Sequence, residues 1–155
     1  MACVALLVVF GVAGCNPFSS SSDSYKNAEL GHFGFDFSAG EETEDYTMSD
    51  GGVISWQPGG ESHPNYPSGD HLWWRNDQVT DDTPNETRSM GTVDIESVKE
   101  APATWEVSPN ITPLLVGNVY VAKCRDGYVK FEVKSLNMEE WTATVKFMFS
   151  SSRSF

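Results

Sequence analysis

The last third of this 155-residue chain holds the feature that most constrains its fold: two alternating apolar runs separated by Asp126-Gly127. An Asp-Gly pair between such runs is typical of a two-residue β-hairpin, since both positions tolerate a positive φ. With that turn, we expect Cys124 opposite Val129 and Ala122 opposite Phe131. A register shift of one residue would turn every apolar side chain to the other face, so the pattern specifies which face is buried.

A third alternating run follows the hairpin and completes a predicted β-meander. Its apolar positions are Trp141, Ala143, Val145, Phe147 and Phe149. Shorter strands are predicted within residues 33–37, 53–56, 71–75 and 92–98, and no amphipathic helix pattern of useful length appears. The predicted fold is therefore all-β: an antiparallel β-sandwich with long loops and a C-terminal β-meander.

The segment from Gly117 to Phe131 resembles a recurrent ending of HmuY-like bacterial lipoproteins, "VY-hydrophobic-x-[RK]-T-x-DG-x-YxK". The matching positions are Tyr120, Asp126, Gly127 and Lys130. The chain departs from the pattern at Cys124, where the family usually has Thr, and in a shortened spacing after the glycine. The resemblance implies a β-rich, lipid-anchored protein, and the founding members bind haem between two axial histidines. No histidine lies near the matched segment.

The N-terminus indicates export and a lipid anchor. Residues 2–14 contain no charged or polar side chain and suit a signal-peptide core, although no Lys or Arg precedes them, which we interpret as a start codon placed too late. Val12-Ala13-Gly14-Cys15 resembles the lipobox, in which the cysteine thiol receives diacylglycerol. We expect a signal peptide over 1–14, a lipidated Cys15 with a Ser-rich tether over 15–27, and a β-sandwich domain over 28–155. Asn16 in place of Asp favours the outer membrane if the cell is Gram-negative.

Composition narrows the classes of function. The formal net charge is −12, which disfavours nucleic acid as a partner because an acidic surface repels phosphates. The G-x-S-x-G, H-E-x-x-H and P-loop motifs do not occur, so we do not expect an enzyme. Once Cys3 has left with the signal peptide and Cys15 is acylated, Cys124 has no partner in the chain, and we expect it to be buried.

The candidate binding site lies in the Pro/Gly-rich loop of residues 57–70 and in the residues that follow it. His63 lies within this loop and His71 directly after it, and Trp73 and Trp74 follow. Two imidazoles with aromatic walls could ligate a haem iron, or a transition metal with Glu61 or Asp70 adding oxygen. The alternative is that both histidines are ordinary surface residues of a loop.

A second hypothesis for the same region is glycan recognition. Trp56, Tyr66, Trp73 and Trp74 could form an aromatic platform for a sugar ring, although strand alternation predicts that one of the two adjacent tryptophans faces the core. The sequence thus predicts an exported, lipid-anchored binding module of the cell envelope, with haem or metal capture in the HmuY manner. The alternatives are a glycan-binding or a purely structural surface lipoprotein.

Overall fold

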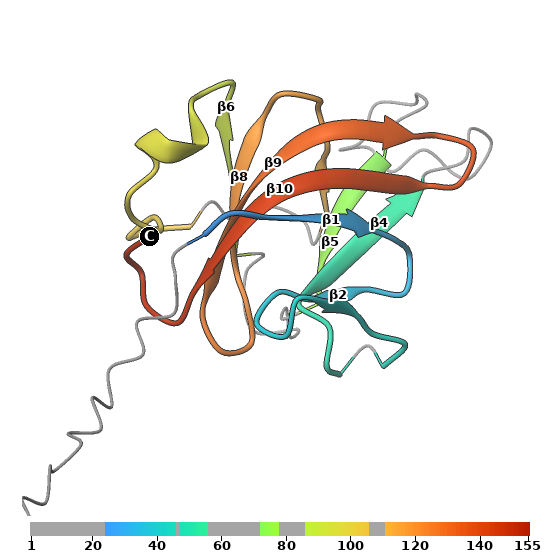
Figure 1. Ribbon diagram of the computed structural model, residues 1–155, viewed down its shortest axis with the longest axis horizontal. Helices are drawn as coiled ribbons and strands as arrows, with labels where there is room; N and C mark the ends of the chain where they lie inside the picture. The colour runs from blue at the N-terminus through green and yellow to red at the C-terminus, as the bar shows by residue number, and fades with distance from the viewer. Residues whose placement is uncertain (1–23, 46, 56–71, 78–85, 106–110) are drawn as a thin grey trace, which may run out of the picture.

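A computed structural model describes residues 24–45, 47–55, 72–77, 86–105 and 111–155. It consists of two antiparallel five-stranded sheets, so the predicted all-β sandwich is confirmed (Figure 1). The predicted signal peptide and most of the predicted tether lie outside the described residues.

The first sheet, here called the meander sheet, has the strand order β1-β10-β9-β8-β6. Its strands are β1 (Lys26–Leu30), β6 (Thr87–Gly91), β8 (Val119–Lys123), β9 (Tyr128–Asn137) and β10 (Thr142–Ser150). The second, here called the short-strand sheet, has the order β3-β2-β4-β5-β7. Its strands are β2 (Phe35–Asp36), β3 (Glu41–Glu42), β4 (Gly51–Ser55), β5 (Leu72–Asn76) and β7 (Ile111–Pro113).

The main core lies between the two sheets and is rich in aromatic rings. Phe37 stacks on Phe131 at 6.1 Å between ring centroids, and Trp74 lies 5.2 Å from Phe131. Tyr120 contributes a ring to the same core, while its hydroxyl donates to the Pro113 carbonyl at 2.9 Å. Inner-face residues of both sheets therefore bury one shared apolar layer, as expected for a sandwich.

The β8–β9 hairpin exists, but its predicted register is wrong by two residues. Ala122 lies opposite Val129 and Tyr120 opposite Phe131, and the Cys124 amide donates to the Gly127 carbonyl at 2.8 Å. The turn is therefore centred on residues 125–126. A shift of two residues preserves the alternation, so all the predicted inner side chains of this hairpin are still buried.

Gly127 does not adopt the predicted positive φ. The requirement for glycine at this position therefore has another cause. A Cβ atom at this position would lie 2.3 Å from the Ser150 carbonyl oxygen and 2.7 Å from a ring carbon of Phe149. The hairpin thus requires glycine because β10 passes directly against the turn.

The outer face of the meander sheet is also partly buried, which the alternation pattern did not predict. Val119 and Val121 have no exposed surface and pack with the 3-10 turn η1 (Ile95–Ser97) and its neighbours. Lys130 is 2% exposed; its Nζ donates to the Val98 carbonyl at 2.8 Å and lies over the rings of Tyr25 and Phe155. Burial lowers the pKa of this lysine.

Further differences from the sequence predictions concern strand boundaries. Strand β1 begins at Lys26, inside the predicted tether, and Phe33 is 62% exposed rather than part of a strand. The segment predicted as a strand over 92–98 contains η1, whereas the neighbouring strand is β6. Trp141 precedes β10 with a φ of 58° and is 41% exposed, so it does not belong to the buried face.

Candidate functional site

Most of the predicted ligand-binding residues lie outside the part of the chain that the structure describes. His63, Tyr66 and His71 lie outside the described residues, as do Trp56, Glu61 and Asp70. The convergence of the two histidines on a haem or a metal therefore remains a prediction. In the described part of the chain, no group of three or more His, Cys, Asp and Glu side chains is arranged to hold a metal ion.

The two predicted tryptophans lie on β5, and both are buried. Trp74 has no exposed surface and packs in the main core, and its Nε1 donates to Thr87 Oγ1 at 3.2 Å. Trp73 is 3% exposed. A fully buried indole presents no face to a sugar ring, so the predicted glycan platform is wrong for Trp74. The expectation that the two indoles divide between the core and the surface is therefore wrong as well, since neither is exposed.

A polar cluster, buried at Asp36 and Asp50 and exposed at Arg125, joins the two sheets at the β8–β9 turn. Asp50 accepts hydrogen bonds from the Phe37 amide at 2.9 Å and from the Arg125 amide at 2.8 Å. The Arg125 guanidinium also forms an ion pair with Asp36 at 2.9 Å. We call Asp36, Asp50 and Arg125 the Asp50 joint. It ties the turn of the meander sheet to the short-strand sheet.

The electrostatics of this cluster fit a structural role. Burial raises the pKa of Asp50, and the two amide hydrogen bonds only partly oppose that effect. Burial also acts on Asp36, but hydrogen bonds from Ala39, Ser38 and Arg125 outweigh it and lower the pKa of that carboxyl. Burial, reinforced by the nearby Asp50, raises the pKa of the Cys124 thiol well above its ordinary range. Cys124 is therefore a protonated core residue at neutral pH rather than a nucleophile.

A hollow of about 650 Å³ opens at the end of the sandwich where β1 begins and β10 ends. Hydroxyl groups dominate its lining, with aromatic rings and one lysine beside them. The lining residues are Ser24, Lys26, Phe37, Ser38, Phe147, Met148, Phe149, Ser150, Ser151, Ser152, Ser154 and Phe155. Its volume is in the range of small-molecule sites, which are usually about 300–1,000 Å³. The sequence signal that could have indicated it is the Ser-rich run over 150–154, which directly follows the last alternating strand.

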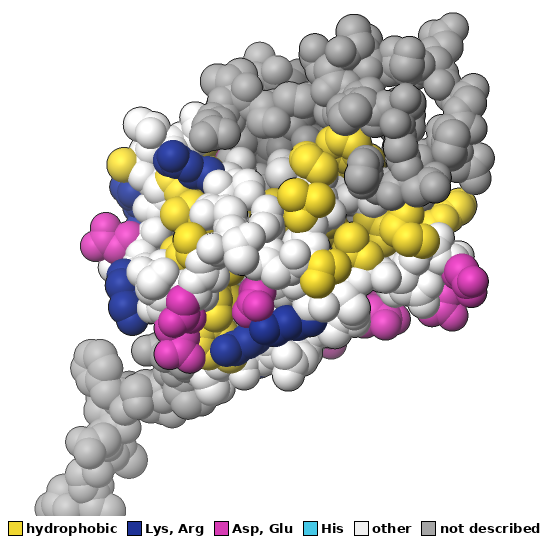
Figure 2. Space-filling view, turned by 90° about the horizontal axis from the view of Figure 1, so that it is seen from above, with side chains coloured by type: hydrophobic (Ala, Val, Ile, Leu, Met, Phe, Trp, Pro, Cys, Tyr) yellow, Lys and Arg dark blue, Asp and Glu magenta, His cyan; other side chains and the backbone are white. Residues whose placement is uncertain are grey.

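The described surface also exposes large apolar side chains. Figure 2 shows apolar side chains in separate groups on the face seen from above. The exposed large apolar residues are Phe33, Met48, Val93, Leu115, Val116, Met138 and Trp141. Trp141 is a residue that the sequence reading misplaced, because its alternation with Ala143 continued the pattern of the strand.

Comparisons with protein-family models, with curated proteins and with solved structures find no significant match. Within the described residues, no helix is long and apolar enough to cross a membrane. The class that fold and surface define is thus an acidic, two-sheet β-sandwich, and the resemblance to HmuY-like lipoproteins remains a prediction from the sequence.

Proposed function

We propose that this chain is an exported lipoprotein of the cell envelope that holds a β-sandwich binding module outside the cytoplasm. The observation that supports it most is the motif Val12-Ala13-Gly14-Cys15 at the end of an uncharged apolar run, followed by a Ser-rich stretch. The first strand begins at Lys26, 26 − 15 = 11 residues after the cysteine. Eleven extended residues reach at most about 40 Å, which would keep the sandwich beside the membrane.

Metabolic labelling with a radioactive or clickable fatty acid tests the anchor. The full chain should incorporate the label, and Cys15→Ser should abolish incorporation. Cys3→Ser is the matched control, because it makes the same change within the apolar run and should leave labelling intact. Label entering the Cys15→Ser protein would refute the lipoprotein assignment.

The binding role of the module includes haem or metal capture through His63 and His71, as the sequence predicted. Haemin titration of the full chain should produce a shifted Soret band that is lost in the His63→Ala/His71→Ala double variant. His32→Ala is the control, since His32 is an exposed histidine beside an aromatic ring, 5.9 Å from Phe33. An unchanged Soret spectrum in the double variant would remove haem from the proposal and leave the anchor untouched.

A further inference from the structure

The hollow at the start of β1 differs in charge from the rest of this acidic chain. The full sequence has 22 Asp and Glu residues and only 10 Lys and Arg. Yet none of the described residues that line the hollow is acidic, and one of them, Lys26, is basic. In a protein with a net charge of −12, this lining offers an anionic group one ammonium and no carboxylate.

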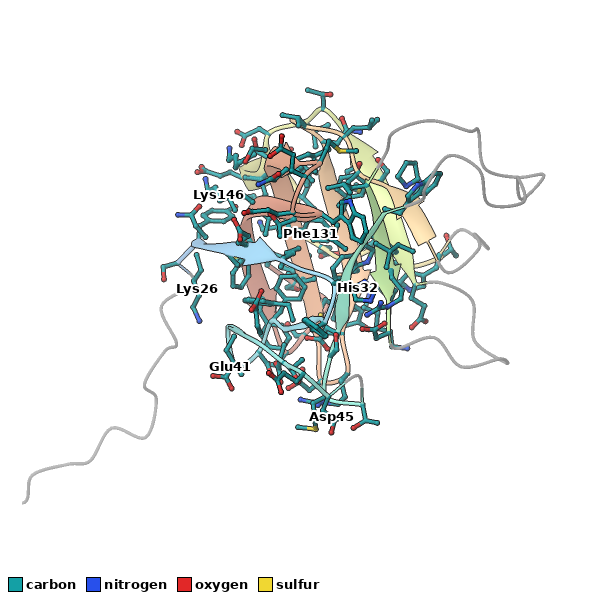
Figure 3. The ribbon with its side chains drawn as sticks, turned by 90° about the vertical axis from the view of Figure 1, so that its right-hand side faces the viewer. Lys26, His32, Glu41, Asp45, Phe131 and Lys146 are labelled. Carbon is teal, nitrogen blue, oxygen red and sulfur yellow. The ribbon has the colours of Figure 1, made fainter. Side chains whose placement is uncertain are left out.

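Lys26 is available to a ligand at this hollow. Its side chain is exposed, and among the described residues it takes part in no ion pair. In Figure 3 it points away from Lys146 and toward the loop that carries Glu41. Its Nζ lies 3.4 Å from where a Cβ of Gly40 would be, which places the ammonium against the β2–β3 turn at the rim.

The C-terminal serines form a shaped, hydroxyl-rich wall. The Ser150 hydroxyl donates to the Ser154 carbonyl at 2.6 Å and accepts from the Ser152 amide at 3.2 Å. A hydrogen bond to another part of the chain also holds this segment in place, since the Phe155 amide donates to the Lys99 carbonyl at 2.8 Å. A wall held by its own hydrogen bonds loses little further entropy when a ligand binds.

Aromatic side chains supply the apolar part of the hollow. Phe149 and Phe155 are each partly exposed, whereas Phe37 and Phe147 form a buried floor. Sugar rings combine hydroxyl groups with apolar C–H faces, and sites that combine an apolar surface with a few placed polar groups recognise such mixed ligands. A single ammonium at the rim adds a preference for one negative charge.

We infer that this hollow is a binding site for a saccharide that carries one carboxylate, such as a uronic acid. The inference deepens the binding role of the proposed function and uses neither the loop histidines nor the buried tryptophans. An anchored chain would hold the site close to the bilayer, because Ser24 follows Cys15 by 24 − 15 = 9 residues, at most about 30 Å when extended.

The test is a titration of the purified full chain with glucuronate, glucose and acetate, followed by ¹H–¹⁵N NMR. Glucuronate should shift the amide signals of residues 148–155 and bind more tightly than glucose, and acetate should have little effect. Lys26→Gln should weaken glucuronate binding about three- to fivefold and leave glucose unchanged, as expected for one partly exposed ion pair. Lys134→Gln is the matched control, because Lys134 is an exposed lysine of β9 that does not line the hollow.

A second variant fills the hollow without changing the charge of the protein. Ser151 is exposed and lines the hollow, so Ser151→Trp should fill it and abolish saccharide binding while the fold survives. Ser135→Trp makes the same change at an exposed β9 position outside the hollow and should bind as the parent does. No saccharide binding up to tens of millimolar, equal binding of acetate, or unchanged binding by Ser151→Trp would each overturn the site. None of these outcomes would affect the fatty-acid labelling that tests the anchor.

Discussion

The two sheets of this sandwich are built in different ways. The meander sheet has strands of nine and ten residues, β10 and β9, which pair along almost their whole length. The short-strand sheet has no described strand longer than five residues, and two of its strands have only two. Long ladders carry their own cross-strand pairs, whereas short strands depend on what packs against them. We therefore expect the short-strand sheet to be stable only while it is joined to the meander sheet.

Trp74 is the largest fully buried side chain among the described residues, and it carries the short-strand sheet's β5 into the shared core. Trp74→Ala should lower the free energy of unfolding by about 3–5 kcal/mol, since it removes a fully buried aromatic ring and leaves a cavity. Trp141→Ala makes the same change at a residue that is 41% exposed and should cost far less. Chemical denaturation of both variants checks this, and equal losses would contradict the assignment of Trp74 to the core.

Gly127 tests the contact of the hairpin turn with β10. Gly127→Val should cost about 3 kcal/mol, the upper end of what overpacking usually costs, because even a Cβ would lie 2.3 Å from the Ser150 carbonyl oxygen. Gly31→Val is the control, since among the described residues beyond its chain neighbours a Cβ there would meet only the flexible end of Glu42, at 3.3 Å. Melting midpoints that fall equally in the two variants would show that β10 does not constrain the turn.

The Asp50 joint tests how the sheets are held together. Asp50→Ala leaves the buried Phe37 amide without its acceptor, while the Arg125 amide at the exposed turn can reach water. An unpaired buried amide costs about 1–3 kcal/mol, so we expect a loss of about 2 kcal/mol in the free energy of unfolding. The measurement is urea denaturation at neutral pH, and a loss below about 0.5 kcal/mol would argue against the joint.

The raised pKa of Asp50 predicts a pH dependence with a definite sign. Between its ordinary pKa of 3.8 and the raised value, the folded protein binds more protons at this carboxyl than the unfolded chain. The contribution of Asp50 to stability therefore falls as pH rises through that interval. Asp50→Asn has no such proton, so its destabilisation relative to the parent should shrink as pH rises above 3.8. Asp36, whose pKa is lowered, acts in the opposite direction below 3.8 and is present in both proteins.

Much of the meander sheet could be predicted from sequence, because its faces follow a period of two over long runs. The buried face of the β8–β9 hairpin was predicted correctly, although the predicted pairing was wrong by two residues. A shift of two residues leaves each side chain on the same face of the strand. The burial of Lys130 could not be predicted. It depends on Tyr25 and Phe155, which meet over it from the two ends of the described domain.

The short-strand sheet and the candidate site were less predictable. A strand of two residues such as β2 is too short to show an alternating pattern. The exposed Phe33 extended the apparent alternation of Phe35 and Phe37 beyond the real strand. The hollow combines Lys26 with serines more than 120 positions away, a juxtaposition that only the pairing of β1 with β10 creates.

The smallest expected effect concerns Trp141, whose φ of 58° is unusual for a bulky residue. Trp141→Gly should raise the free energy of unfolding by about 1 kcal/mol, because the left-handed conformation costs an L side chain about 1–2 kcal/mol. Trp141→Ala removes the indole but keeps the side-chain strain, which separates the two effects. A lower melting temperature for the glycine variant would show that contacts of the indole outweigh the strain.

Native-state hydrogen exchange tests most directly the claim that the short-strand sheet depends on the meander sheet. The amides of Phe131 and Val145 should exchange only through global unfolding, whereas those of Val53 and Trp74 should exchange through a local opening of lower free energy. Asp50→Ala should reduce protection in β4 and β5 by a larger factor than in β9 and β10. Equal protection in both sheets, reduced equally by Asp50→Ala, would contradict the account.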